Sequence, residues 1–141
     1  MQLDLPQQGE RDWYKKFTKA LNDAAGMISL DASTRNYTLT NGATKSTDSP
    51  LYLWREKSYY MDRIYGVGNI KIPALQAGQN FGIVMPFDIY AGDFITGDVF
   101  TYDFKPYFGV DPHNGQILIY VDTATQAKDY WFKFEVAHYK V

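Results

Sequence analysis

Hydrophobic and polar residues alternate through most of the chain after residue 36, and the alternation is clearest near the C-terminus. Side chains of a β-strand point in turn to its two faces, so a period of two predicts a strand with one buried face. The expected buried face is formed by Tyr130, Phe132, Phe134 and Val136. The expected opposite face is formed by Trp131, Lys133, Glu135 and Ala137.

The same pattern, interrupted by turn residues, predicts a series of shorter strands. They cover residues 37–40, 51–55, 59–65, 70–72, 81–85, 89–95, 99–104, 107–110 and 117–121. Asn41-Gly42 is a strong signal for a tight turn, and Asp111-Pro112-His113-Asn114-Gly115 is dense in turn-forming residues. Many short strands with frequent turns predict a mainly β fold, an antiparallel β-sandwich or barrel.

Before the β region, the spacing of apolar residues predicts one short amphipathic helix over residues 10–25. Trp13, Phe17 and Leu21 recur every four residues and share one face of it. A single short helix cannot cover such a stripe itself, and exposed apolar patches mark interfaces. We therefore expect residues 1–30 to form an arm and helix used for attachment or oligomerisation, with Trp13, Phe17 and Leu21 at the oligomer interface. Residues 31–141 form the expected β-sandwich head domain.

Length, charge and cysteine content exclude several classes of protein. The 141 residues correspond to one ordinary domain, and the absence of cysteine rules out disulfides and thiolate metal sites. A net charge of −2, with both signs mixed along the chain, argues against nucleic-acid binding. No apolar run approaches a membrane span, and the N-terminus lacks the pattern of a signal peptide. We expect a protein made in the cytoplasm and not inserted into a membrane.

Candidate catalytic chemistry is sparse. The two histidines, His113 and His138, lie far apart in the sequence, with no ligand spacing that favours a metal site, and no cofactor motif is present. Asp93, Asp98 and Asp103 follow one another through a Gly-rich, aromatic segment. A glycosidase would need two such carboxylates facing one cleft. We expect a protein without catalytic activity, metal or cofactor.

The high aromatic content suggests what the β domain binds. Aromatic residues make up 17% of the chain, and 12 of them are tyrosines. A pyranose ring stacks its C–H face on Trp or Tyr, while charged side chains take its hydroxyl groups. Residues with this mixture are candidates for a saccharide site: Trp54, Tyr59, Asp62, Arg63 and Trp131. The alternative is that the same rings pack within the sheet or between subunits.

Two stretches resemble a known family. Residues 3–13, an apolar arm with Pro6 and Gly9 followed by Asp12-Trp13, resemble the opening of bacteriophage tail-fibre and baseplate proteins, as does the end of the helix at residues 20–24. The second stretch is the C-terminal half, in which the order of segments is similar to that of the β-sandwich heads of phage receptor-binding proteins. These segments are Leu53-Trp54-Arg55, residues 73–78, the turn at 111–115, residues 116–120 and Tyr130-Trp131-Phe132.

This resemblance implies a structural protein of a phage or prophage tail, located in the virion. It implies a homotrimer that contacts other tail or baseplate proteins and binds a host cell-wall saccharide. Two alternatives remain open from the sequence. One is a purely structural assembly component without a ligand, and the other is a small glycan-degrading enzyme.

Overall fold

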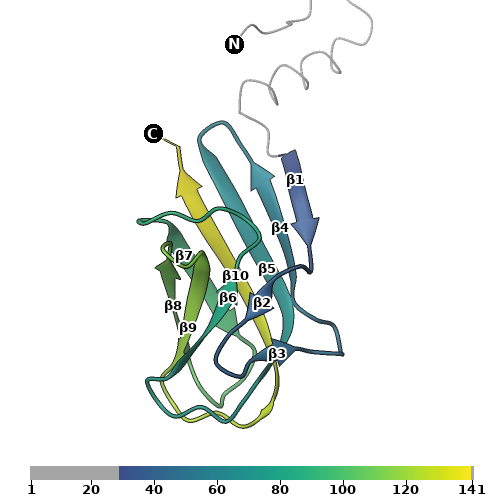
Figure 1. Ribbon diagram of the computed structural model, residues 1–141, viewed down its shortest axis with the longest axis vertical. Helices are drawn as coiled ribbons and strands as arrows, with labels where there is room; N and C mark the ends of the chain where they lie inside the picture. The colour runs from purple at the N-terminus through teal and green to yellow at the C-terminus, as the bar shows by residue number, and fades with distance from the viewer. Residues whose placement is uncertain (1–28, 141) are drawn as a thin grey trace, which may run out of the picture.

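The structure, a computed structural model, describes residues 29–140, which fold into ten β-strands without a helix (Figure 1). The mainly β fold predicted from the alternation is confirmed. The predicted helix over residues 10–25, with Trp13, Phe17 and Leu21, lies outside the described residues. The strands are β1 Ser29–Thr34, β2 Thr38–Leu39, β3 Thr44–Lys45, β4 Tyr52–Lys57, β5 Met61–Ile72, β6 Asn80–Val84, β7 Phe94–Val99, β8 Pro106–Asp111, β9 Gln116–Val121 and β10 Lys128–Tyr139.

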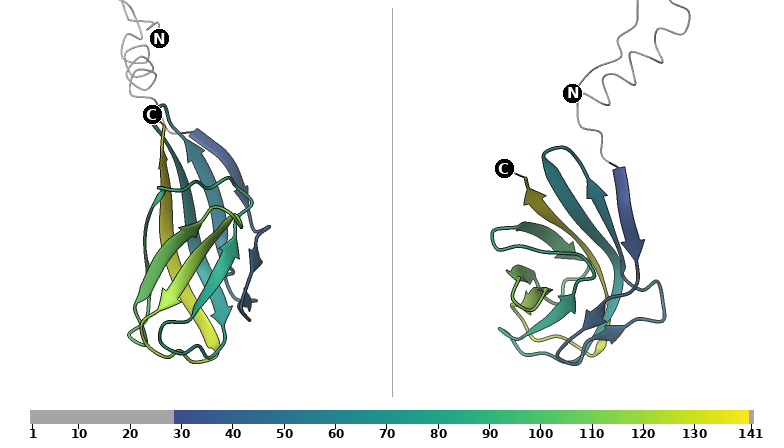
Figure 2. Two further views of the ribbon diagram at one scale, coloured as in Figure 1. Left: turned by 60° about the vertical axis from the view of Figure 1, so that its left-hand side comes forward. Right: turned by 45° about the horizontal axis from the view of Figure 1, so that its top comes forward.

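The strands form two antiparallel sheets that pack face to face as a β-sandwich (Figure 2). Sheet A has the order β1-β4-β5-β10-β7, with the short β3 paired to the far part of β5. Sheet B has the order β2-β6-β9-β8. The start of β1 and the end of β10 flank the β4–β5 turn, since Ser29 pairs with Lys57 and Tyr139 pairs with Met61. Both ends of the described chain therefore lie at one end of the sandwich (Figure 1).

The core fills the space between the sheets and is rich in aromatic rings. Phe132 and Phe134 of β10 are fully buried, as the alternation predicts. Phe132 meets Phe81 of sheet B with 5.8 Å between ring centroids, and Phe134 meets Phe108 at 6.1 Å. Burial of such large side chains is the main stabilising contribution in a domain of this size.

Some strand boundaries differ from those predicted. The turn at Asn41-Gly42 is present, with both residues at positive φ. Residues 89–95, predicted as a strand, instead contain a turn in which the Asp93 N–H donates to the Tyr90 carbonyl. The strand predicted at residues 99–104 is also wrong, because β7 ends at Val99. Beyond it, the Thr101 N–H bonds locally to the Val99 carbonyl instead of joining a sheet.

The first strand, β1, was not predicted from the alternation. It lies at the edge of sheet A, pairs with β4 alone, and contains a register shift between Leu30 and Ala32. Small and polar residues fill most of it, so the hydrophobic pattern is faint. Among residues 29–140, no helix has the length and hydropathy needed to cross a bilayer.

Candidate functional site

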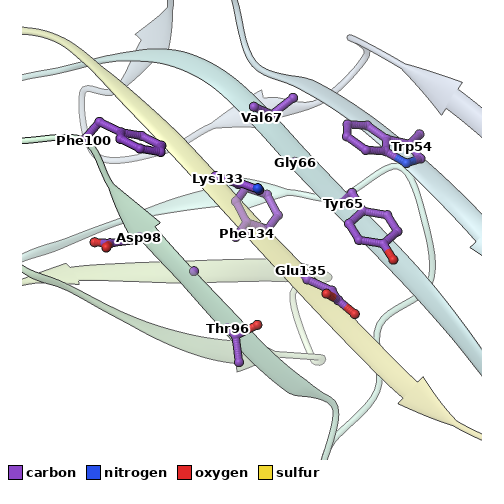
Figure 3. A pocket seen from close by; sticks show the side chains of 11 residues that line it. Trp54, Tyr65, Gly66, Val67, Thr96, Asp98, Phe100, Lys133, Phe134 and Glu135 are labelled. Carbon is purple, nitrogen blue, oxygen red and sulfur yellow. The ribbon is translucent and has the colours of Figure 1, made fainter.

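The outer face of sheet A, which points away from sheet B, carries a groove of about 590 Å³ (Figure 3). Strand pairing sets its residues side by side. One row across the sheet consists of Trp54, Tyr65, Glu135 and Thr96, from β4, β5, β10 and β7 in that order. The next row consists of Tyr52, Val67, Lys133 and Asp98. The full lining of this outer groove is Trp54, Tyr65, Gly66, Val67, Thr96, Gly97, Asp98, Phe100, Lys133, Phe134 and Glu135.

An aromatic wall borders the outer groove on one side. The Trp54 and Tyr65 rings stack with 5.2 Å between centroids and 20° between planes. Tyr52 extends the wall along β4, with its ring centroid 6.0 Å from that of Trp54. Phe100 lies across the groove from this wall, with Lys133 and Glu135 between them (Figure 3). The Phe100 side chain is largely exposed, at 68%. The groove thus offers apolar ring surface on two sides.

The floor of the outer groove passes through two glycines. Gly66 and Gly97 pair with Phe134 from opposite sides, one from β5 and one from β7. A Cβ on Gly97 would lie 2.7 Å from both the Phe108 ring and the Phe134 Cβ, and a Cβ on Gly66 would overlap the Phe134 ring. The glycines therefore allow Phe134 to fill the core beneath the groove.

Charged groups line the middle of the groove and balance one another. Arg63 Nε lies 3.4 Å from Glu135 Oε1, and Arg63 Nη1 donates to the Tyr65 hydroxyl at 3.3 Å. The hydrogen bond with Tyr65, helped by the charge of Glu135, raises the pKa of Arg63. Lys133 and Asp98 face each other across β10 and β7 but form no ion pair with any described residue. Asp98 Oδ1 accepts a hydrogen bond from the Val99 N–H at 2.8 Å, which leaves Asp98 Oδ2 and the Lys133 ammonium to contact a ligand.

The structure places the five predicted site residues in three environments. Trp54 lines the outer groove, and Arg63 lies beside it on the same face. Trp131 also faces outward but does not line the groove. Tyr59 lies in the β4–β5 turn, with its ring packed edge-on against Tyr60. Asp62 lines a different pocket, and its Oδ1 is 2.9 Å from Lys140 Nζ.

Groove residues that were not among the predicted saccharide-binding residues come from β5, β7, β10 and the position directly after β7. Tyr65, Thr96, Phe100, Lys133 and Glu135 complete the site. Alternation along the last strand assigns Lys133 and Glu135 to the face of Trp131, and this was the available signal. The pairing of β10 with β5 and β7 joins segments that are distant in the sequence, and a single sequence does not specify it.

A second, polar pocket of about 210 Å³ lies at the end of the sandwich where β1 begins and β10 ends. Its lining is Arg55, Lys57, Asp62, Ile64, Asp88, Tyr90, Asp93, Val136 and His138. His138 Nδ1 lies 2.7 Å from Asp93 Oδ1, and the Tyr90 ring packs on the imidazole at 4.3 Å. Asp93 also accepts a hydrogen bond from the Tyr90 N–H. These contacts fasten the β6–β7 loop to β10.

The three spaced carboxylates of the sequence do not share one pocket, although Asp98 and Asp103 both line a hollow of about 340 Å³ beside the end of β7. Asp93 lines the second pocket, and Asp98 lines the outer groove. Asp103 contacts Lys128 at 3.0 Å and accepts from the Tyr130 hydroxyl at 3.0 Å, and the hydrogen bond from Lys128 lowers its pKa. His113 lies in the exposed β8–β9 turn, away from the Asp93–His138 pair. Across residues 29–140, no cluster of three or more His, Asp or Glu side chains could hold a metal ion.

Comparison with known proteins finds no relative that would assign a function. No protein-family model matches the chain, and no curated protein or solved structure matches it either.

Proposed function

We propose that this protein binds a saccharide in the outer groove, and that it does so as the host-surface-binding component of a phage tail. The observation that carries the saccharide proposal is the stacked pair Trp54–Tyr65, which forms a wall of the groove. The face of a pyranose ring that carries C–H groups packs on such a ring, because both surfaces are apolar and flat. Binding sites for small ligands combine apolar surface with a few placed polar groups, as this groove does.

The polar side chains of the groove suit sugar hydroxyl groups, which both donate and accept hydrogen bonds. Lys133 donates, while Asp98 and Glu135 accept. The groove is open to solvent, so a single site is expected to bind weakly, with a dissociation constant of roughly millimolar. Several copies joined on one particle would raise the apparent affinity through avidity.

The phage-tail part of the proposal is supported by the resemblance of residues 3–13 and of the β region to tail proteins. Light scattering on the full chain should give a trimer, three times the mass of the 141-residue chain. Phe17→Asp, on the predicted helix stripe, should reduce this mass while leaving the β-sheet circular dichroism unchanged. A monomeric wild-type protein would contradict the assembly.

The test of saccharide binding compares residues on the same sheet face inside and outside the groove. Wild-type protein is screened for retardation in native gels that contain soluble bacterial cell-wall polysaccharides, then titrated by calorimetry with fragments of any that retard it. Trp54→Ala should abolish binding. Trp131→Ala, on the same face but outside the groove, should keep it, as should Tyr107→Ala on sheet B. Binding lost equally in the Trp54 and Trp131 variants would reject the groove as the site.

Glycan cleavage is the second candidate function, because Asp98 and Glu135 both line the groove. Glycoside hydrolysis uses two carboxyl groups, one on each side of the bond that breaks. Mass spectrometry of an oligosaccharide incubated with the protein distinguishes the two functions. Unchanged chain length supports binding alone, whereas shortening that is abolished in both Asp98→Asn and Glu135→Gln would identify an enzyme.

A further inference from the structure

We infer that the ligand of the outer groove is an uncharged oligosaccharide that spans two aromatic subsites, one at Trp54–Tyr65 and one at Phe100. This inference rests on the proposed saccharide function and adds the class and the minimum size of the ligand.

The separation of the two aromatic surfaces sets the minimum size. Tyr65 belongs to β5, and Phe100 directly follows β7, with β10 between these strands. Two strand spacings amount to roughly 10 Å, and Phe100 also lies four residues beyond Thr96 of the Tyr65 row, which adds roughly 13 Å along the chain direction. One pyranose ring cannot contact both surfaces. A chain of at least two sugar rings can, and the groove volume of about 590 Å³ accommodates it.

Among the large hydrophobic residues that are exposed between residues 29 and 140, Phe100 is the one that lines the outer groove. Phe100 is 68% exposed, whereas Val99 beside it is buried in the core. Its backbone N–H donates to the Trp131 carbonyl at 2.9 Å, which fixes the position where β7 ends. A large apolar ring held at the rim of a groove by a fixed backbone is suited to cover one end of an extended ligand.

The charges of the groove favour a neutral ligand. Two anionic groups of the groove, Glu135 and Asp98, are matched by two cationic groups, Lys133 within the groove and Arg63 beside it. A uronic acid or a phosphorylated sugar would meet the carboxylates of Asp98 and Glu135, and an amino sugar would meet the ammonium of Lys133. Like-charge contacts of this kind discriminate against charged ligands. Hydroxyl groups can bond to both kinds of side chain.

The test measures affinity against chain length for neutral gluco-, manno- and galacto-oligosaccharides and for uronic-acid oligosaccharides. Calorimetry on the wild-type full chain should show affinity for one neutral series rising about tenfold from the monosaccharide to the trisaccharide. Phe100→Ala should remove this gain, so that its affinity for the trisaccharide falls to its affinity for the monosaccharide. Because the ring is exposed, this variant should fold, and its melting temperature provides the check.

Three results would overturn the inference. The first is equal affinity for short and long chains. The second is a Phe100→Ala variant whose affinity depends on chain length as in the wild type. The third is tighter binding of the uronic-acid series at low salt that is lost at high salt. Each of these leaves saccharide binding itself intact, provided that Trp54→Ala abolishes it. Failure of the wild-type protein to bind any oligosaccharide would overturn the proposed function together with this inference.

Discussion

Aromatic residues have different roles on the two faces of sheet A, and β10 shows the contrast between the faces within one strand. Its inner side chains, Phe132 and Phe134, are fully buried against rings of sheet B. Its outer side chains, Lys133 and Glu135, lie between the aromatic wall and Phe100 of the groove. Neighbouring residues therefore contribute to separate properties, the inner ones to stability and the outer ones to the proposed recognition. Whether a side chain is buried or exposed separates the two roles better than its residue type does.

The largest expected effect compares two adjacent aromatic residues. Phe132→Ala should lower the free energy of unfolding by about 3–5 kcal/mol, because it leaves a cavity between the sheets. Trp131→Ala, its neighbour on the outer face, should lower it by about 1 kcal/mol. Urea unfolding followed by circular dichroism measures both. Equal losses would mean that the outer face also contributes to the core.

A smaller loss of stability is expected at Gly97, which lies between the outer groove and the core. Gly97→Ala would place a Cβ 2.7 Å from the Phe108 ring and 2.9 Å from the Lys133 carbonyl oxygen. Because the second neighbour is backbone, β7 and β10 must shift, and we expect a loss of about 1–3 kcal/mol in urea unfolding. Gly92→Ala is an imperfect steric control. Its Cβ would meet no atom within 4 Å, and its φ is +89°. Any loss of stability in this variant therefore reports backbone strain and not a steric clash. A wild-type stability for Gly97→Ala would show that the floor of the groove is loosely packed.

The smallest expected effect concerns a buried hydroxyl group of the core. The Tyr37 hydroxyl donates to the Leu51 carbonyl at 2.8 Å, and removing it in Tyr37→Phe should cost about 1 kcal/mol. Tyr52→Phe, on the outer face, is the matched control and should stay close to wild type.

The same tyrosine predicts a dependence of stability on alkaline pH. Burial raises the pKa of Tyr37 from 10.0 to about 12. The unfolded chain therefore loses the proton first, and the contribution of Tyr37 is fully present below pH 10 and is lost as the pH rises towards 12. Unfolding free energies measured across this range should fall less steeply for Tyr37→Phe than for wild type. An identical slope would mean that other groups cause the fall.

Much of the fold could be predicted from the sequence, because alternation is a local property. The buried face of β10 was predicted residue by residue, and so was the turn at Asn41-Gly42. The predictions failed where short-range hydrogen bonds replaced sheet pairing, as in the turn from Tyr90 to Asp93. They also failed where an edge strand, β1, carries few large apolar residues.

The candidate site was predicted less well, because it depends on which strands become neighbours. Trp54 and Arg63 were identified by composition, and both face the groove side of sheet A. Asp62 was chosen with Arg63, yet two successive residues of a strand cannot share a face. Applying the alternation of β5 would have favoured Tyr65 over Asp62. The contribution of Thr96 and Asp98 from β7 requires the pairing of distant segments.

The position of Phe134 has an evolutionary consequence, because this one residue belongs both to the core and to the lining of the groove. Changes at Thr96, Asp98 or Lys133 alter the ligand-facing surface without entering the core. Changes at Gly66, Gly97 or Phe134 alter both at once. A lineage of this protein could therefore change its ligand by drifting at the first set of positions, while the second set holds the scaffold constant.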